Sequence, residues 1–215
     1  MSVEKSSQER MSVASHLIVP ILLKPLLQKL ARQSSESAHI LNSAIIKAES
    51  HSPGISLELV SGILKKADMN VNMTESLLRL QGNMPEIEDY AVRRHEEPFQ
   101  ELNKKSVALR RILSRIPDEI NDRRTFLETI KEIASAIKKL LDCVNAITNY
   151  IYDPTDKQVI EVRKREFIKY SKKFSNTLKE FFREGQSSSV YVSAAHLIHQ
   201  TNLLQVTTKS KCDIR

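Results

Sequence analysis

The chain has 215 residues, 40% of them hydrophobic, and a formal net charge of +7. This composition excludes a disordered chain, and two cysteines are too few for a disulfide framework, so free thiols in a reducing cytosol are expected. Few glycines and abundant leucine, isoleucine, alanine, lysine and glutamate predict an all-α protein. Residues 98–215 hold 22 basic and 14 acidic side chains, so all of the chain's net positive charge lies in this half. Such a basic half favours acidic peptides, anionic lipids or nucleic acid as partners.

Short apolar helices are expected in the first half of the chain. The predicted elements are a polar tail over 1–12, a helical region over 13–33 that is bent or restarted at Pro20 and Pro25, a helix over 36–50, a turn over 52–54 and a third helix capped by Ser56. The apolar stretch Leu17–Leu27 is too short to span a bilayer and lacks a signal cleavage site, which favours a packing helix. Because about fifty residues bury little surface alone, these helices are expected to complete their core by dimerising.

The second half is predicted to form four long helices joined by short turns. A capping box at Asn72–Glu75 opens a short helix, and a connector follows until about Glu97. The expected bundle helices cover 99–115, 119–151, 156–183 and 188–209, with a corner at Ile116–Glu119, a second capping box at Thr155 and Gln158, and Gly185 after the third helix. The expected domains are a disordered tail (1–12), a dimerisation domain (13–67), a connecting helix and linker (68–97) and a four-helix bundle (98–215).

No catalytic or metal-binding constellation is evident in the sequence. Four scattered glycines form no phosphate-binding loop, and there is no zinc-type cysteine pair. His196 and His199 share a helix face, but a packed bundle edge explains them better than a metal. The carboxylates Glu128, Glu132 and Asp142 lie on a helix rich in lysines, which fits a solvated charged face. We therefore expect no enzyme activity, no cofactor and no metal.

Two lysine stripes run beside the core faces of the second and third bundle helices. The core face of the second helix consists of Ile130, Ile133, Ile137, Leu140 and Val144. Its lysine stripe consists of Lys131, Ser135 and Lys138, with Ala134 and Leu141 at the border, and the third helix repeats the pattern at Ile168, Lys172, Ser175 and Lys179. If the helices are antiparallel neighbours, the stripes face one groove that suits an amphipathic helix with leucines and acidic edges. Periodicity alone favours the alternative of a solvated face, and nucleic acid is disfavoured because no base-reading residues accompany the lysines.

Several segments resemble one known family. They are IKAE (Ile46–Glu49) with PG (Pro53–Gly54), NMTESLLR (Asn72–Arg79), ILSRIPDEINDR (Ile112–Arg123), FLETIKEIASAIKKLLD (Phe126–Asp142), EFIKYSKKFSNTLK (Glu166–Lys179) and LIHQTNLL (Leu197–Leu204). In this order they are similar to the programmed cell death protein ten, or cerebral cavernous malformation protein three, family. The sequence differs from that family before Pro25, around Leu80–Asp89 and over Asn149–Arg165, so it does not specify the kinase partner or the interdomain angle.

The resemblance implies a non-catalytic adaptor with an N-terminal dimerisation domain and a C-terminal bundle of focal-adhesion-targeting-homology type. The implied partners are germinal-centre-kinase III protein kinases, the cerebral cavernous malformation scaffold, striatin and paxillin-like proteins, with a homodimer when kinase is absent. The implied dimer interface is Leu41, Ala44, Ile63 and Leu64, and the implied peptide-binding groove is Ile130, Lys131, Ala134, Ser135, Lys138, Leu141, Lys172, Ser175 and Lys179. The family also implies roles in kinase signalling, cell survival, angiogenesis and vascular or epithelial integrity, and a cytoplasmic location with Golgi and peripheral membrane association. A membrane-surface module that binds phosphoinositide through the same lysines is the alternative.

Overall fold

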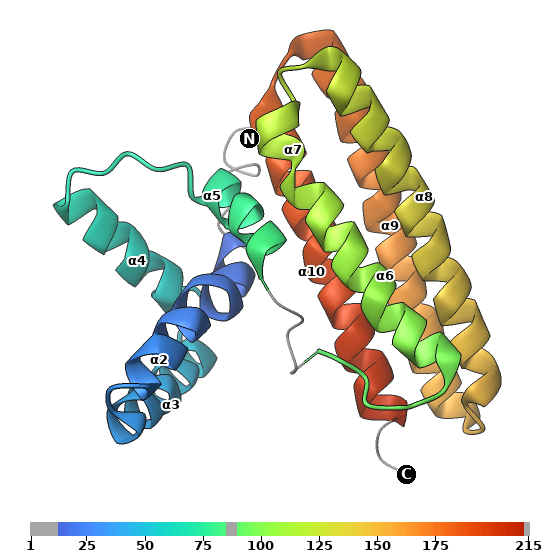
Figure 1. The fold of residues 1–215 in the computed structure, drawn as a ribbon, viewed down its shortest axis with the longest axis horizontal. Helices are drawn as coiled ribbons and strands as arrows, with labels where there is room; N and C mark the ends of the chain where they lie inside the picture. Colours follow the sequence, from blue (N-terminus) through green and yellow to red (C-terminus); the bar gives the residue numbers. More distant parts are fainter. Residues whose placement is uncertain (1–12, 85–89, 213–215) are drawn as a thin grey trace. The chain divides into compact units, whose positions relative to one another are not determined.

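A computed structural model describes residues 13–84 and 90–212 of the chain, and Figure 1 traces their course. Within these residues the regular structure is entirely helical, which confirms the all-α prediction. The chain divides into two compact units, one ending at Leu80 and the other beginning at Gln81. The expected polar tail and a short part of the expected linker, residues 85–89, lie outside the described residues.

The first unit consists of a long bent helix followed by three shorter ones. Its elements are a helical stretch over Val13–Ala31, which contains the π-helical turn η1 (Val19–Leu23) and ends as α2 (Lys24–Ala31), then α3 (Ser35–His51), α4 (Ile55–Lys66) and α5 (Met73–Leu80). The π turn lies where the sequence predicts a bend, because Pro20 and Pro25 donate no backbone hydrogen bonds. The backbone N–H of Lys24 closes this turn on the carbonyl of Val19.

This first helical stretch is more continuous than the sequence predicts. Among the described residues, Val13–Ala31 is the one helix long and apolar enough to cross a membrane by length and composition, with a mean hydropathy of 1.3 over its best window. Core helices of soluble proteins and signal sequences have the same length and composition, and 33% of that window is buried. The burial of Leu17, Ile18 and Ile21 supports the interpretation as a packing helix.

The corner between α3 and α4 differs from the prediction. Gly54, with a left-handed φ of +96°, precedes α4, whereas Ser56 lies inside the helix. The carboxylate of Glu49 provides the cap, because it accepts hydrogen bonds from Gly54 N at 2.6 Å and from the backbone and hydroxyl of Ser56 at 3.1 and 2.6 Å. The predicted Ser56 cap is therefore wrong: the charged acceptor comes from the preceding helix and reaches the N–H groups only in the folded corner.

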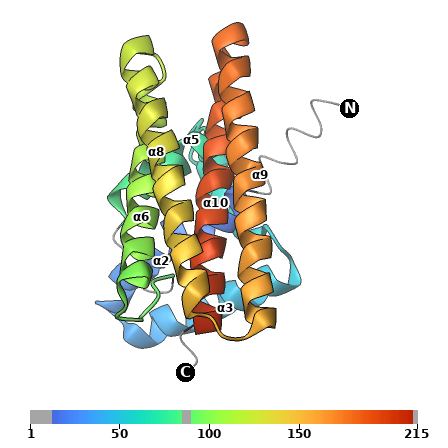
Figure 2. The same ribbon diagram turned by 90° about the vertical axis from the view of Figure 1, so that its right-hand side faces the viewer.

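The second unit is a bundle of four long helices with short connecting elements. Its elements are η2 (Gln81–Asn83), α6 (Glu97–Ser114), α7 (Ile116–Glu119), α8 (Arg123–Ile147), η3 (Thr148–Tyr150), α9 (Pro154–Glu184) and α10 (Ser187–Cys212). Figure 2 shows α6, α8, α9 and α10 side by side, with α6 packed mainly on α8 and α9 mainly on α10. The fully buried side chains of this unit include Phe99, Leu109, Phe126, Leu140, Phe167 and Leu197.

Two helix starts in the bundle differ from the predictions. The second bundle helix begins at Arg123 rather than near residue 119, because the carboxylate of Asp122 accepts from the N–H groups of the first turn. The third begins at Pro154, because Asp153 accepts from Thr155 N at 2.7 Å. The capping box predicted at Thr155 is wrong, since aspartate followed by proline makes the better start. Two other predictions are confirmed: Gly185 ends α9 with φ +77°, and Asn72 accepts from Glu75 N at 3.3 Å.

Candidate functional site

The seam between α8 and α9 holds both predicted lysine stripes. The two helices follow one another through the short connection at η3, so they run in opposite directions, as Figure 2 shows. They touch each other much less than α8 touches α6 or α9 touches α10. Their ribbons diverge toward the end where α8 begins and α9 finishes (Figure 2). A seam of this kind leaves side chains on both helices accessible.

Two cross-seam contacts fix which residues of α8 and α9 lie at the same level. Near the connection, Lys164 Nζ donates to Asn145 Oδ1 at 3.0 Å. At the other end, the rings of Phe126 and Phe182 are 6.0 Å apart. Because each step toward the start of α8 is matched by a step toward the end of α9, these contacts set the register of the predicted stripes. The resulting levels pair Lys138 with Lys172, Ser135 with Ser175 and Lys131 with Lys179.

Most of the predicted groove residues are exposed to solvent. Ile130 and Leu141 are half-buried beside the fully buried core positions Ile133 and Leu140. The remaining groove residues are exposed: Lys131, Ala134, Ser135, Lys138, Lys172, Ser175 and Lys179. We call this set, with Ile130 and Leu141, the seam groove.

The lysines of the seam groove differ in their partners. Lys131 pairs with Glu128 on its own helix at 2.8 Å, and both side chains are largely exposed. Within the described part of the chain, the ammonium groups of Lys138, Lys172 and Lys179 form neither an ion pair nor a hydrogen bond. Three cations without internal partners leave the groove positively charged, and a carboxylate can approach them without breaking an existing pair.

Sequence reasoning missed the contacts that close the two ends of the seam. At the diverging end, Phe126 is fully buried and meets Phe181 edge-on, with ring centroids 5.7 Å apart. Adjacent aromatic residues at the end of the third helix were the available signal, but their partner on α8 is distant in sequence. The Lys164–Asn145 bond at the other end had no sequence signal, because a lysine and an asparagine are common on helix surfaces.

The corner that leads into α8 carries a charged network that the sequence also did not reveal. Arg115 donates to Glu119 Oε1 at 2.8 Å and to both carboxylate oxygens of Glu132 at 3.0 and 3.2 Å. It also donates to Thr129 Oγ1 at 3.1 Å, and Thr129 in turn donates to Glu119. The hydrogen bond from Arg115 holds the pKa of Glu132 below its ordinary value and raises the pKa of the arginine itself. The network ties α7 to α8 immediately before the seam groove.

The first unit exposes apolar side chains where the dimer interface was expected. Leu41 and Ala44 lie on the outer face of α3, and the leucine is 45% exposed. On α4, Ile63 is 59% exposed and Leu64 is half-buried. Other large apolar side chains on the two helices are exposed as well, namely Ile40, Ile46, Ile55 and Leu59. An apolar surface of this extent is typical of a protein–protein interface.

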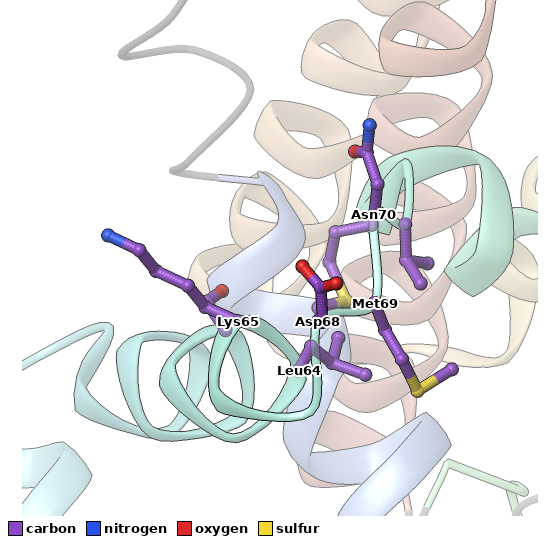
Figure 3. A pocket seen from close by; sticks show the side chains of 8 residues that line it. Leu64, Lys65, Asp68, Met69 and Asn70 are labelled. Carbon is purple, nitrogen blue, oxygen red and sulfur yellow. The ribbon is translucent and has the colours of Figure 1, made fainter.

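A hollow of about 330 Å³ adjoins this surface at the end of α4 (Figure 3). Leu64, Asp68 and Met69 line it, and Asp68 adopts a left-handed φ of 55° where the helix ends. Figure 3 shows the Lys65 side chain extending away from these residues. Two methionines and aliphatic side chains line the hollow together with the polar side chains of Ser61, Lys65, Asp68 and Asn70, and such a mixed lining suits a side chain of a protein partner.

The described residues contain no group of three or more histidine, cysteine, aspartate and glutamate side chains able to hold a metal. His196 lies against the ring of Tyr170, with centroids 5.3 Å apart, which agrees with the packed-edge interpretation. The pKa of Cys143 is raised, chiefly by burial, so its thiol is protonated at neutral pH and a poor nucleophile. The arrangement as a whole is suited to binding other proteins.

Comparison with known proteins gives consistent matches in both units. A family model described as Programmed cell death protein 10, dimerisation domain, matches residues 11–70, and one described as Programmed cell death protein 10, C-terminal, matches residues 71–161. The Programmed cell death protein 10 homolog of Caenorhabditis elegans is 39% identical over 198 residues, which cover 88% of this chain and 91% of the relative. The matched C-terminal region contains all of α8 and the beginning of α9.

Proposed function

Because the chain belongs to the programmed cell death protein 10 family, we propose that it is an adaptor that couples a protein kinase to adhesion and scaffold proteins. Membership supports a non-catalytic, dimerising role connected with cell death. The finer proposal assigns one partner class to each unit. The first unit dimerises with itself or with the tail of a germinal-centre-kinase III protein kinase. The second binds leucine-rich acidic helices of paxillin-like, striatin or cerebral cavernous malformation scaffold proteins.

The observation that carries the proposal for the second unit is the register of the two lysine stripes. Small side chains at the middle level, Ser135 and Ser175, lie between two levels that each carry a lysine from either helix. An amphipathic helix can therefore rest its leucines on the small residues and direct its carboxylates to the lysines on both sides. Exposed ion pairs of this kind contribute more to orientation and association rate than to affinity.

The proposal for the first unit rests on the exposed apolar face of α3 and α4. The match of residues 11–70 to a dimerisation domain supports self-association. Burial of Leu41 and Ile63 against another chain would remove apolar surface from water and stabilise the complex. The hollow beside Leu64 offers room for a side chain of the partner. We further propose roles in kinase signalling, cell survival and angiogenesis, in the cytoplasm with Golgi and peripheral membrane association.

The double substitution Lys138→Glu and Lys179→Glu tests the groove. We expect it to weaken binding of a synthetic acidic leucine-rich helix at least tenfold, because two attractive charges become repulsive, and we expect wild-type affinity to fall as salt rises. The matched control is Lys139→Glu with Lys169→Glu, which changes the net charge equally on exposed positions outside the seam groove. Titration of the folded proteins measures both, and equal weakening by the two double variants would reject the groove.

The lysines without internal partners also favour a second candidate, an anionic-lipid surface such as phosphoinositide. Lipid binding depends on charge and not on leucine placement, so the control variant should then weaken binding as much as the groove variant. Flotation with phosphoinositide-containing liposomes, with and without competing peptide, separates the candidates. Release of the protein from liposomes by peptide would show that both ligands use the seam groove.

A further inference from the structure

We infer that the seam groove ends in an apolar site formed by Leu127, Phe182 and Arg123, which selects a large apolar residue followed by a carboxylate at the C-terminal end of the bound helix. The inference rests on the proposed binding of acidic helices in this groove. Leu127 precedes Lys131 by one helical turn on the same face of α8, and Phe182 follows Lys179 by three residues on α9. Both therefore continue the stripes at the diverging end.

The side chains of Phe182 and Leu127 are both partly exposed to solvent, and neighbouring aromatic rings support Phe182. Phe182 packs against Phe126 at 6.0 Å and Phe181 at 5.5 Å between ring centroids. Although it has this aromatic support, Phe182 remains 43% exposed, and Leu127 is 41% exposed. An apolar side chain of the bound helix can therefore cover the supported ring and the exposed leucine without any rearrangement of the core.

Arg123 supplies the charge of the end site. Its guanidinium carbon is 6.0 Å from the centroid of the Phe182 ring, a distance at which cation and ring attract each other. Among the described residues the guanidinium has no carboxylate partner. The arginine is thus positioned beside the apolar surface with its charge available, which matches an acidic side chain next to the apolar anchor.

The charge at the two ends of the groove sets the direction of the occupant. A helix carries partial negative charge at its C-terminus, so that end is favoured near Arg123. At the opposite end, Lys164 already contacts Glu161 at 2.5 Å and Asn145 at 3.0 Å, so its ammonium group is engaged within the chain. Leu127 and Asn145 are eighteen positions apart, or about 27 Å along α8, so a helix of about five turns spans the groove and its end site.

Three synthetic peptides of matched helicity test the inference on the full chain. All share one acidic leucine-rich core, and they differ in an added turn: Phe-Glu at the C-terminus, Ala-Gln at the C-terminus, or Phe-Glu at the N-terminus. We expect C-terminal Phe-Glu to bind the wild type about tenfold more tightly than C-terminal Ala-Gln, and N-terminal Phe-Glu to give no such gain. Leu127→Ala and Arg123→Gln should each reduce this gain, measured as the ratio of the two affinities, to threefold or less.

Val162→Ala is the matched control, because this α9 valine is also exposed but lies outside the seam groove. It should preserve the full tenfold gain. Equal affinities of the two C-terminal peptides for wild type, or a gain undiminished in Leu127→Ala and Arg123→Gln, would overturn the end site. A gain from the N-terminal extension alone would overturn the direction. If none of the peptides binds wild type, the function proposed for the groove is wrong, and the inference of an end site is then wrong as well.

Discussion

The carboxylate of Glu49 accepts three hydrogen bonds at the start of α4. Its partial burial raises the pKa, but hydrogen bonds from Ser56 and Gly54 outweigh this effect and leave the pKa below its ordinary value of 4.5. The ionised carboxylate is therefore favoured in the folded chain. A depressed pKa contributes stability that is present above the unfolded-state value and is lost as pH falls through the folded-state value.

Replacing Glu49 with glutamine should destabilise the first unit by about 1 kcal/mol at pH 7, as loss of a helix cap does. The amide keeps the shape of the side chain but loses the charge-assisted hydrogen bonds. Thermal unfolding at a fixed protein concentration measures the difference, which should shrink as pH falls through the lowered pKa of Glu49, because the wild-type carboxylate then becomes protonated. If the difference in stability between the wild type and Glu49→Gln is the same at pH 7 and pH 3, the negative charge of Glu49 does not have this stabilising role.

Arg115 is the second residue whose geometry makes a definite prediction. Its guanidinium bonds Glu132 through two nitrogens and Glu119 through a third, a pattern that lysine cannot reproduce. Arg115→Lys should therefore destabilise the bundle by roughly 1 kcal/mol, a modest value because the side chains are partly exposed. The control is Arg111→Lys on the exposed face of α6. Denaturant midpoints of the two variants should differ, and equal midpoints would show that the network contributes nothing.

At the scale of the elements, the binding proposed for the seam groove depends on the small side chains between its lysines as well as on its charge. Ala134→Leu should block a bound helix and lower its affinity at least tenfold, while the stability of α8 stays nearly constant because alanine and leucine have similar helix propensities. Ala108→Leu on the exposed face of α6 is the control for added apolar surface. Peptide titration combined with thermal unfolding separates the steric effect from misfolding. Full affinity in Ala134→Leu would place the ligand elsewhere.

The elements also show what the sequence can and cannot predict. The 3.6-residue periodicity predicted the long helices, and the residue types at their ends gave the glycine that terminates α9 and the asparagine that caps α5. Helix starts were misplaced where a stronger acceptor competed, as Asp153 did with Thr155. Helical periodicity cannot predict the register of α8 and α9, because that register depends on the contacts of Lys164 with Asn145 and of Phe126 with Phe182. Each of those pairs joins residues that no local pattern connects.

For the whole molecule, the two units carry surfaces of different chemistry. The first exposes aliphatic side chains on α3 and α4, and the second exposes lysines along α8 and α9. Apolar surfaces favour stable association, whereas charged rims favour rapid and salt-sensitive binding. Because the two surfaces belong to different units, we expect the two partners to bind independently, so that one chain can hold both.

One measurement tests this central claim most directly: retention of a germinal-centre-kinase III tail on an immobilised acidic leucine-rich peptide by the full chain. The wild type should retain it. Leu41→Asp with Ala44→Asp would bury unpaired charge in the interface proposed for the first unit, so this variant should bind the peptide and retain no kinase tail. Lys138→Glu with Lys179→Glu should bind the kinase tail in solution and fail to reach the peptide. Retention of the kinase tail on the peptide by either folded variant would contradict the account.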